Sequence, residues 1–170
     1  MKTHQFALAS ALLLSALAPA AAHVGVTPDH LPAGAYARLA FTVPHGCKGS
    51  ATTGLQLRIP HEQLHAARPM PKPGWTLEIR RAPLAAPVSL HGRELRDSVV
   101  EISWSGGPLA NAHFDEFVIQ GKLADGNAPL RFEVLQICEQ GRTEWNGTAG
   151  SESPAPVLKI DDADPHAGHH

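Results

Sequence analysis

One histidine stands where signal-peptide cleavage would leave it at the start of a mature chain. The chain begins with a basic Lys2 and an apolar run, and the segment closes on the small residues Ala20 to Ala22, a combination typical of a secretory signal peptide. Cleavage after Ala22 would free the α-amine of His23. That amine and the imidazole Nδ1 can hold one metal ion in a chelate ring, which favours tetragonal Cu(II). We therefore expect residues 1–22 to be a signal peptide and His23 to be a copper ligand; the alternative is a mature chain that begins with histidine by chance.

The two cysteines offer a second kind of chemistry. Cys47 and Cys138 both follow the expected cleavage site, and in an oxidising compartment two cysteines most simply form one disulfide. Such a bond would close a long loop and stabilise the fold by roughly 4–5 kcal/mol in the chain-entropy picture. The alternative is a thiolate metal site that includes His45.

The C-terminal residues differ in character from the rest of the chain. Residues 161–170 have no apolar face to bury, so we expect a disordered tail. This tail contains three aspartates and the histidines His166, His169 and His170. It could bind a divalent metal loosely, the alternative being a solvated tail without a ligand.

Charge and motifs exclude several classes of function. The formal net charge is −2, and loss of Lys2 with the signal peptide makes it −3, so nothing points to nucleic acid or to an anionic membrane surface. No segment after the signal peptide reaches the length of a transmembrane helix, so we expect no anchor in the mature chain. The sequence contains no G-x-S-x-G elbow, no H-E-x-x-H and no phosphate-binding glycine loop. We therefore expect a protein that is not an enzyme.

The elements that position the candidate ligands are predicted to be strands. Apolar and polar residues alternate in short runs separated by turn residues, which is typical of antiparallel sheets with one buried face. Trp75 and Trp104 fall on the apolar side of this alternation and are expected in the core. One helical turn is expected over His61 to Ala67, between two prolines. The expected strands cover Tyr36–Val43, Gly54–Ile59, Trp75–Arg80, Val100–Trp104, Phe114–Gln120, Leu130–Ile137 and Thr143–Asn146.

This number of strands in a mature chain of 148 residues favours a single all-β domain over residues 23–160, an immunoglobulin-like antiparallel β-sandwich. Several segments, in this order along the chain, resemble the YcnI-like bacterial copper-binding proteins. The segments are His23–Pro28, Val43–Ser50, Pro71–Trp75, Trp104–Leu109, Phe114–Phe117, Gln136–Gly141 with Trp145 after it, and Pro154–Pro156. Each segment alone is a weak signal, but together they span nearly the whole mature chain.

The resemblance implies an immunoglobulin-like β-sandwich that binds Cu(II) through a single-histidine brace. It also implies a tryptophan at the site, which corresponds here to Trp145, and a carboxylate ligand. We assign the carboxylate to Glu116, and Asp115 and Glu144 remain alternatives. Many members of the family carry a C-terminal membrane anchor, whereas this chain ends in His-Ala-Gly-His-His, so we expect a free periplasmic or secreted protein.

The expected function is to hold or pass Cu(II) during copper acquisition, trafficking or homeostasis. Other copper-handling proteins of the envelope are the expected partners, because a brace presents the metal at the domain surface. One alternative is a copper-dependent oxidase or monooxygenase that uses the same N-terminal histidine with a second imidazole from His45 or His113. Another alternative is a metal-free interaction module of the envelope.

Overall fold

The structure is a computed structural model that describes residues 23–162. The predicted signal peptide at residues 1–22 and the tail at 163–170 lie outside the described residues. Asp161, assigned from the sequence to the start of the tail, is the last residue of a strand.

Within residues 23–162 the chain forms twelve strands and no helix. The strands are β1 (Gly25–Thr27), β2 (His30–Pro32), β3 (Tyr36–Val43), β4 (Thr52–Arg58), β5 (Leu64–Pro69), β6 (Trp75–Leu90), β7 (Arg93–Leu109), β8 (Asp115–Leu123), β9 (Leu130–Arg131), β10 (Glu133–Cys138), β11 (Arg142–Trp145) and β12 (Val157–Asp161). The all-β prediction is therefore confirmed. Among these residues no helix is long and apolar enough to cross a membrane.

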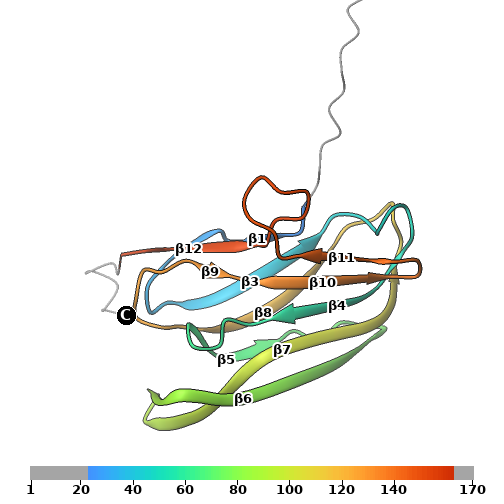
Figure 1. Cartoon of the computed structure of the whole chain (residues 1–170). Helices are drawn as coiled ribbons and strands as arrows, with labels where there is room; N and C mark the ends of the chain where they lie inside the picture. Colours follow the sequence, from blue (N-terminus) through green and yellow to red (C-terminus); the bar gives the residue numbers. More distant parts are fainter. Residues whose placement is uncertain (1–22, 163–170) are drawn as a thin grey trace, which may run out of the picture.

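Two larger sheets and one small sheet make up the fold (Figure 1). The four-stranded sheet has the order β1-β3-β8-β5, and the five-stranded sheet has the order β11-β10-β4-β7-β6. All pairings within these two sheets are antiparallel. The small sheet has the order β2-β12-β9, and its β2–β12 pair is parallel.

Aromatic side chains from the two larger sheets meet in the core. Trp104 of β7 is 1% exposed, and its ring centroid lies 5.4 Å from that of Phe117 of β8. Phe41 of β3 packs edge-on against Phe132, with ring centroids 4.9 Å apart. These contacts bury the apolar faces that the alternation predicted, so the sandwich arrangement is confirmed.

One expected strand matches the structure, and another is divided between two sheets. Tyr36–Val43 matches β3 residue for residue. The run Leu130–Ile137, however, is divided at Phe132 into β9 and β10, which belong to different sheets. Phe132 donates its backbone N–H to the carbonyl of Pro156, the residue just before β12, and the Phe132 side chain is fully buried. The chain therefore changes sheets at a residue whose apolar side chain gave no sign of a break.

The hairpin of β6 and β7 is much longer than the alternation predicted (Figure 1). The expected strands covered only Trp75–Arg80 and Val100–Trp104, the part that packs on the sandwich. Most side chains of the outer part are exposed, so it lacks the alternation that a half-buried strand shows. Its tip returns to the four-stranded sheet, where His91 stacks on Tyr36 with ring centroids 5.8 Å apart.

The expected helical turn over His61 to Ala67 is replaced by a single turn and a strand. Leu64 donates its backbone N–H to the carbonyl of Pro60, and β5 begins at Leu64 itself. β5 pairs with β8 and contains one extra residue between His65 and Arg68. Pairing with a neighbouring strand thus overrides the local helical tendency of this short segment.

Candidate metal site

His23 is held at the end of the sandwich by the short strand that follows it. Val24 is 2% and Val26 is 8% exposed, and both belong to the core. Gly25 lies opposite Thr42 of β3. Because buried and exposed residues alternate, the side chain of His23 remains exposed while the backbone beside it is anchored.

The rings of His23 and Trp145 are in contact. Their centroids lie 6.0 Å apart, and the planes meet at 66° in an edge-on arrangement. Trp145 is the last residue of β11, lies opposite Val134 of β10 and is 5% exposed. Its strand partner was not evident from the sequence. Two residues far apart in the chain therefore lie together at one end of the molecule, where the loop between β11 and β12 projects beside the start of β1 (Figure 1).

A buried glutamine holds the indole of Trp145. Gln136 of β10 is 1% exposed, and its Oε1 accepts a hydrogen bond from Trp145 Nε1 at 3.0 Å. Its Nε2 donates to the carbonyl of His45 at 2.7 Å and to Thr52 Oγ1 at 2.8 Å. Three hydrogen bonds on one amide fix the rotamer of Gln136, and this in turn fixes the indole beside His23.

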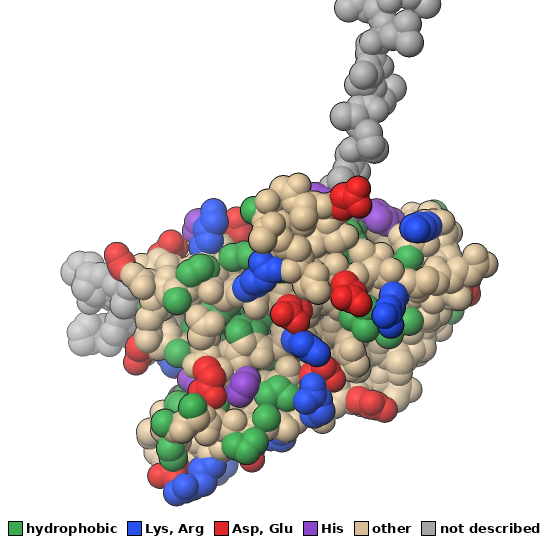
Figure 2. Space-filling view, in the orientation of Figure 1, with side chains coloured by type: hydrophobic (Ala, Val, Ile, Leu, Met, Phe, Trp, Pro, Cys, Tyr) green, Lys and Arg blue, Asp and Glu red, His purple; other side chains and the backbone are tan. Residues whose placement is uncertain are grey.

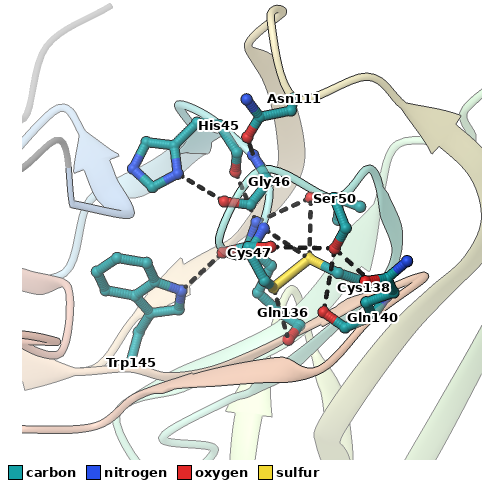
Figure 3. The surroundings of a disulfide bond; sticks show 10 residues. His45, Gly46, Cys47, Ser50, Asn111, Gln136, Cys138, Gln140 and Trp145 are labelled. Carbon is teal, nitrogen blue, oxygen red and sulfur yellow. Dashed lines mark hydrogen bonds between the residues drawn. A yellow bond between two sulfur atoms is a disulfide. The ribbon is translucent and has the colours of Figure 1, made fainter.

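The disulfide lies next to Gln136 and the loop of His45 (Figure 3). Cys47 and Cys138 are bonded, with Cα atoms 5.9 Å apart, so the predicted disulfide is present and neither sulfur is a thiolate ligand here. The backbone N–H of Cys47 also donates to Cys138 Sγ at 3.0 Å. The bond ties the loop that carries His45 to the strand that carries Gln136.

His45 lies in the loop between β3 and β4, and its ring is partly buried. Its Nδ1 lies 2.7 Å from the carbonyl of Gly46, which can only accept, so Nδ1 carries the proton. In the neutral ring Nε2 then holds the lone pair, which is the form of imidazole that binds metals. Figure 3 shows this ring on the same side of the disulfide as the indole of Trp145. His113 is exposed in the turn before β8.

The three candidate carboxylates lie on different parts of the surface. Glu116 of β8 is exposed and lies opposite Thr42, so it is two strands away from Gly25. Asp115 forms an ion pair with Lys72, with 2.6 Å between Nζ and Oδ1. Glu144 precedes Trp145 and faces the outside of the five-stranded sheet.

None of these carboxylates is joined to His23 or Trp145 by a hydrogen bond or ion pair within residues 23–162. In the same part of the chain, no three His, Cys, Asp or Glu side chains cluster closely enough to hold a metal ion. A chelate made by one histidine and its own amine needs no such cluster. The contact between His23 and Trp145 is therefore the part of the expected site that the fold assembles.

The central place of Gln136 in this site was not recognised from the sequence. Its position in a strand predicts a side chain on one face of a sheet. That this side chain is buried and supports Trp145 can be recognised only when its three hydrogen-bond partners are known. The one available signal was a polar residue between the apolar Val134 and Cys138 on the buried side of β10.

The first prediction concerns this glutamine. Gln136→Leu leaves the buried N–H of Trp145 and the carbonyl of His45 without a partner, at about 1–3 kcal/mol for each group. We expect the free energy of unfolding to fall by about 3 kcal/mol in urea titrations. The control is Gln56→Leu on the adjacent β4, because the Gln56 side chain makes no hydrogen bond within residues 23–162. Equal losses for the two variants would contradict the role of Gln136.

Comparison with known proteins places this chain in a family. Residues 23–160 match the family described as "Domain of unknown function (DUF1775)". The chain belongs to this family. DUF1775 is the YcnI-like family, so the resemblance found in the sequence segments is confirmed at the level of the family. No curated protein matches the chain.

A solved structure supports the fold of this DUF1775 domain. A protein from Nocardia farcinica, whose crystal structure is described as revealing an immunoglobulin-like fold, is 24% identical with a TM-score of 0.62. The match covers 84% of this chain and 99% of that one. The expected immunoglobulin-like fold is therefore confirmed. The Reelin-N domain of F-spondin is 12% identical over 82% of this chain and 86% of that one, with a TM-score of 0.43.

Proposed function

We propose that this protein binds one Cu(II) ion through the α-amine and the imidazole Nδ1 of His23, after cleavage between Ala22 and His23. It acts in the periplasm or outside the cell, where it holds or passes copper without catalysing a reaction. Other copper-handling proteins of the envelope are its partners, because the metal sits at an exposed end of the domain where they can reach it.

The contact between the rings of His23 and Trp145 carries this proposal. An indole beside the imidazole covers one side of the metal and limits the access of water to it. The hydrogen bond from Trp145 to Gln136 and the buried Val24 hold both partners in place. A chelating residue on an anchored backbone loses little conformational freedom when the metal binds.

The additional carboxylate ligand is assigned to Glu116. Gly25, Thr42 and Glu116 form one row across β1, β3 and β8, so Glu116 shares the outer face of the sheet with the exposed residues of β1. The two strand spacings between Gly25 and Glu116 amount to about 9.6 Å. A carboxylate from Glu116 therefore reaches the metal only if the mature N-terminus leans across this face. Asp115 and Glu144 remain alternatives.

A copper-dependent oxidase is the second candidate function. The observation in its favour is the hydrogen bond that links Gln136 to the loop of His45, because this bond ties a second imidazole to the residue that holds Trp145. Supplying reductant and oxygen to the copper-loaded protein separates the two candidates. A carrier consumes reductant and oxygen no faster than an equal amount of Cu(II) in buffer, whereas an oxidase consumes them much faster over many turnovers.

The second prediction tests the proposed site by fluorescence. Cu(II), but not Zn(II), is expected to quench the emission of the mature protein at one equivalent, because a d⁹ ion near an indole opens a non-radiative path. Trp145→Phe removes most of this quenching and leaves the 1:1 complex intact in a native mass spectrum. His166, His169 and His170 are replaced by alanine in every sample, so that the tail adds no second site.

Trp104→Phe is the matched control for this experiment. Trp104 is as deeply buried as Trp145, but its Nε1 donates to the carbonyl of Met70 and it lies in the core between the sheets. We expect this variant to keep the Cu(II) quenching. If the Trp145→Phe protein is quenched as fully as its parent, Trp145 is not beside the metal.

A further inference from the structure

A row of three polar residues crosses the outer face of the four-stranded sheet. Arg38 of β3 and Arg68 of β5 both lie opposite Gln120 of β8, one on each side. Side chains that lie opposite one another in a sheet point to the same face. Two guanidinium groups therefore flank one amide. The Cα atoms of the two arginines are separated by two strand spacings, or about 9.6 Å.

The position of Arg68 in this row depends on a bulge in β5. His65 lies opposite Lys122 and Arg68 lies opposite Gln120, so three steps on β5 match two steps on β8. The bulge includes Ala66, whose φ of 50° lies in the left-handed region that a residue with a Cβ rarely adopts. Without the extra residue, Ala67 and not Arg68 would lie opposite Gln120. Bulges of this kind re-aim side chains and are frequent beside functional sites.

The row forms the floor of a cavity of about 420 Å³. Lys122, Tyr36 and His91 also line it, and no Asp or Glu does. Lys122 donates to the carbonyl of Gly34 and lies 5.0 Å from the centre of the Tyr36 ring, without a carboxylate partner in the described part of the chain. A second hollow of about 250 Å³ shares Arg38, Arg68 and Gln120.

The two arginines have no partner for their charge. Within residues 23–162 the side chains of Arg38 and Arg68 make no hydrogen bond and no ion pair. Like charges held close together on one face repel one another, so such a group is unfavourable unless an anion joins it.

The outer face of the five-stranded sheet shows the opposite pattern. There Arg58 lies 3.3 Å from Glu133, and Arg80 lies 3.0 Å from Glu101. Basic and acidic side chains are intermixed on the face seen in Figure 2. Among the described residues, the absence of acidic partners is therefore local to Arg38 and Arg68. Elsewhere on the four-stranded sheet, Asp115 pairs with Lys72.

We propose that the row of Arg38, Gln120 and Arg68 is a binding site for a phosphate group, carried by free phosphate or by a lipid headgroup. Guanidinium groups match phosphate oxygens with paired hydrogen bonds, and the Gln120 amide can donate a further one. Arg38, Arg68 and Lys122 line the cavity, and no Asp or Glu does. This excess of positive charge favours a doubly charged phosphate over a singly charged carboxylate. The ring of Tyr36 forms an apolar edge against the rest of the ligand. This site is independent of the proposed copper site.

Two arms of one experiment distinguish the sources of the phosphate. The metal-free mature protein is titrated with inorganic phosphate and followed by amide NMR, and it is sedimented with vesicles of phosphatidylcholine with or without phosphatidic acid. We expect binding in at least one arm, with NMR shifts centred on Gln120 in the phosphate arm. The double variant Arg38→Gln and Arg68→Gln is expected to weaken that binding at least about tenfold.

The matched control removes the same charge from the β6–β7 hairpin, outside the cavity. Arg81 and Arg96 are exposed and pair with Asp97 and Glu94. The double variant Arg81→Gln and Arg96→Gln is expected to bind phosphate as the parent does. Two results overturn the proposal: no binding in either arm, or an equal loss in both double variants, which indicates general charge attraction. Amide spectra of each variant without ligand establish that the fold is retained.

Discussion

Acetylation of the His23 α-amine is expected to lower the affinity of the mature protein for Cu(II) by at least about 100-fold, or about 2.7 kcal/mol. Acetylation delocalises the lone pair of this nitrogen into the amide and makes it a poor donor, so the amine–imidazole chelate ring is lost and only the imidazole remains. Acetylation leaves the imidazole and Trp145 in place and introduces no new amine. A chain that keeps Ala22 is a weaker test, because the amine of Ala22 could itself bind copper. Competition titration with a chelator of known affinity measures the change.

Two controls accompany this measurement. His23→Ala keeps a free amine and removes the imidazole, so it is expected to lose affinity as well. Acetylated and free chains should unfold at the same urea concentration, because the N-terminal amine is at the surface beside the buried Val24. Undiminished Cu(II) binding by the acetylated chain would falsify the brace and with it the proposed function, without bearing on the proposed phosphate site.

Replacing both cysteines by serine is expected to lower the free energy of unfolding by about 4–5 kcal/mol. The bond between Cys47 and Cys138 spans 91 residues, and removing it gives the unfolded chain back the freedom of that loop. Urea titrations of the two proteins measure the difference from the midpoint and the slope. This loss is a large part of the stability of an ordinary domain.

Thiol labelling provides the matching chemical test. The exported protein, unfolded without reductant, is expected to contain no free thiol, and the same protein after reduction should contain two. Labelling of both cysteines without reductant would show that the exported chain lacks the bond.

The alternation of apolar and polar residues along the chain was sufficient to predict the all-β fold and several of its strands. In Tyr36–Val43 and Gly54–Ile59 the apolar side chains recur at every second position, because one face of each strand is buried in the sandwich. Most side chains in the outer part of the β6–β7 hairpin are exposed, so no periodic signal marked it. The disulfide was predicted because only two cysteines are present.

In the candidate site, too, local sequence patterns revealed one residue, and the contact between residues required the tertiary structure. His23 could be recognised from the sequence, since the chemistry of an N-terminal chelate lies within one residue and its position after small residues is a local pattern. Trp145 was assigned to it by family resemblance alone. The ring contact between them joins the segment just before β1 to the end of β11, and only the pairing of strands far apart in sequence brings the two together.

Gln136 and Arg68 show what the tertiary structure alone decided. The three partners of Gln136 come from three separate segments, so a glutamine in a strand becomes the support of an indole only after the sheet has formed. Arg68 faces Gln120 because one extra residue at Ala66 shifts the register of β5. Alternation follows from the geometry of a single strand and can be read locally, whereas register and the meeting of distant segments depend on the free energy of the whole packed fold.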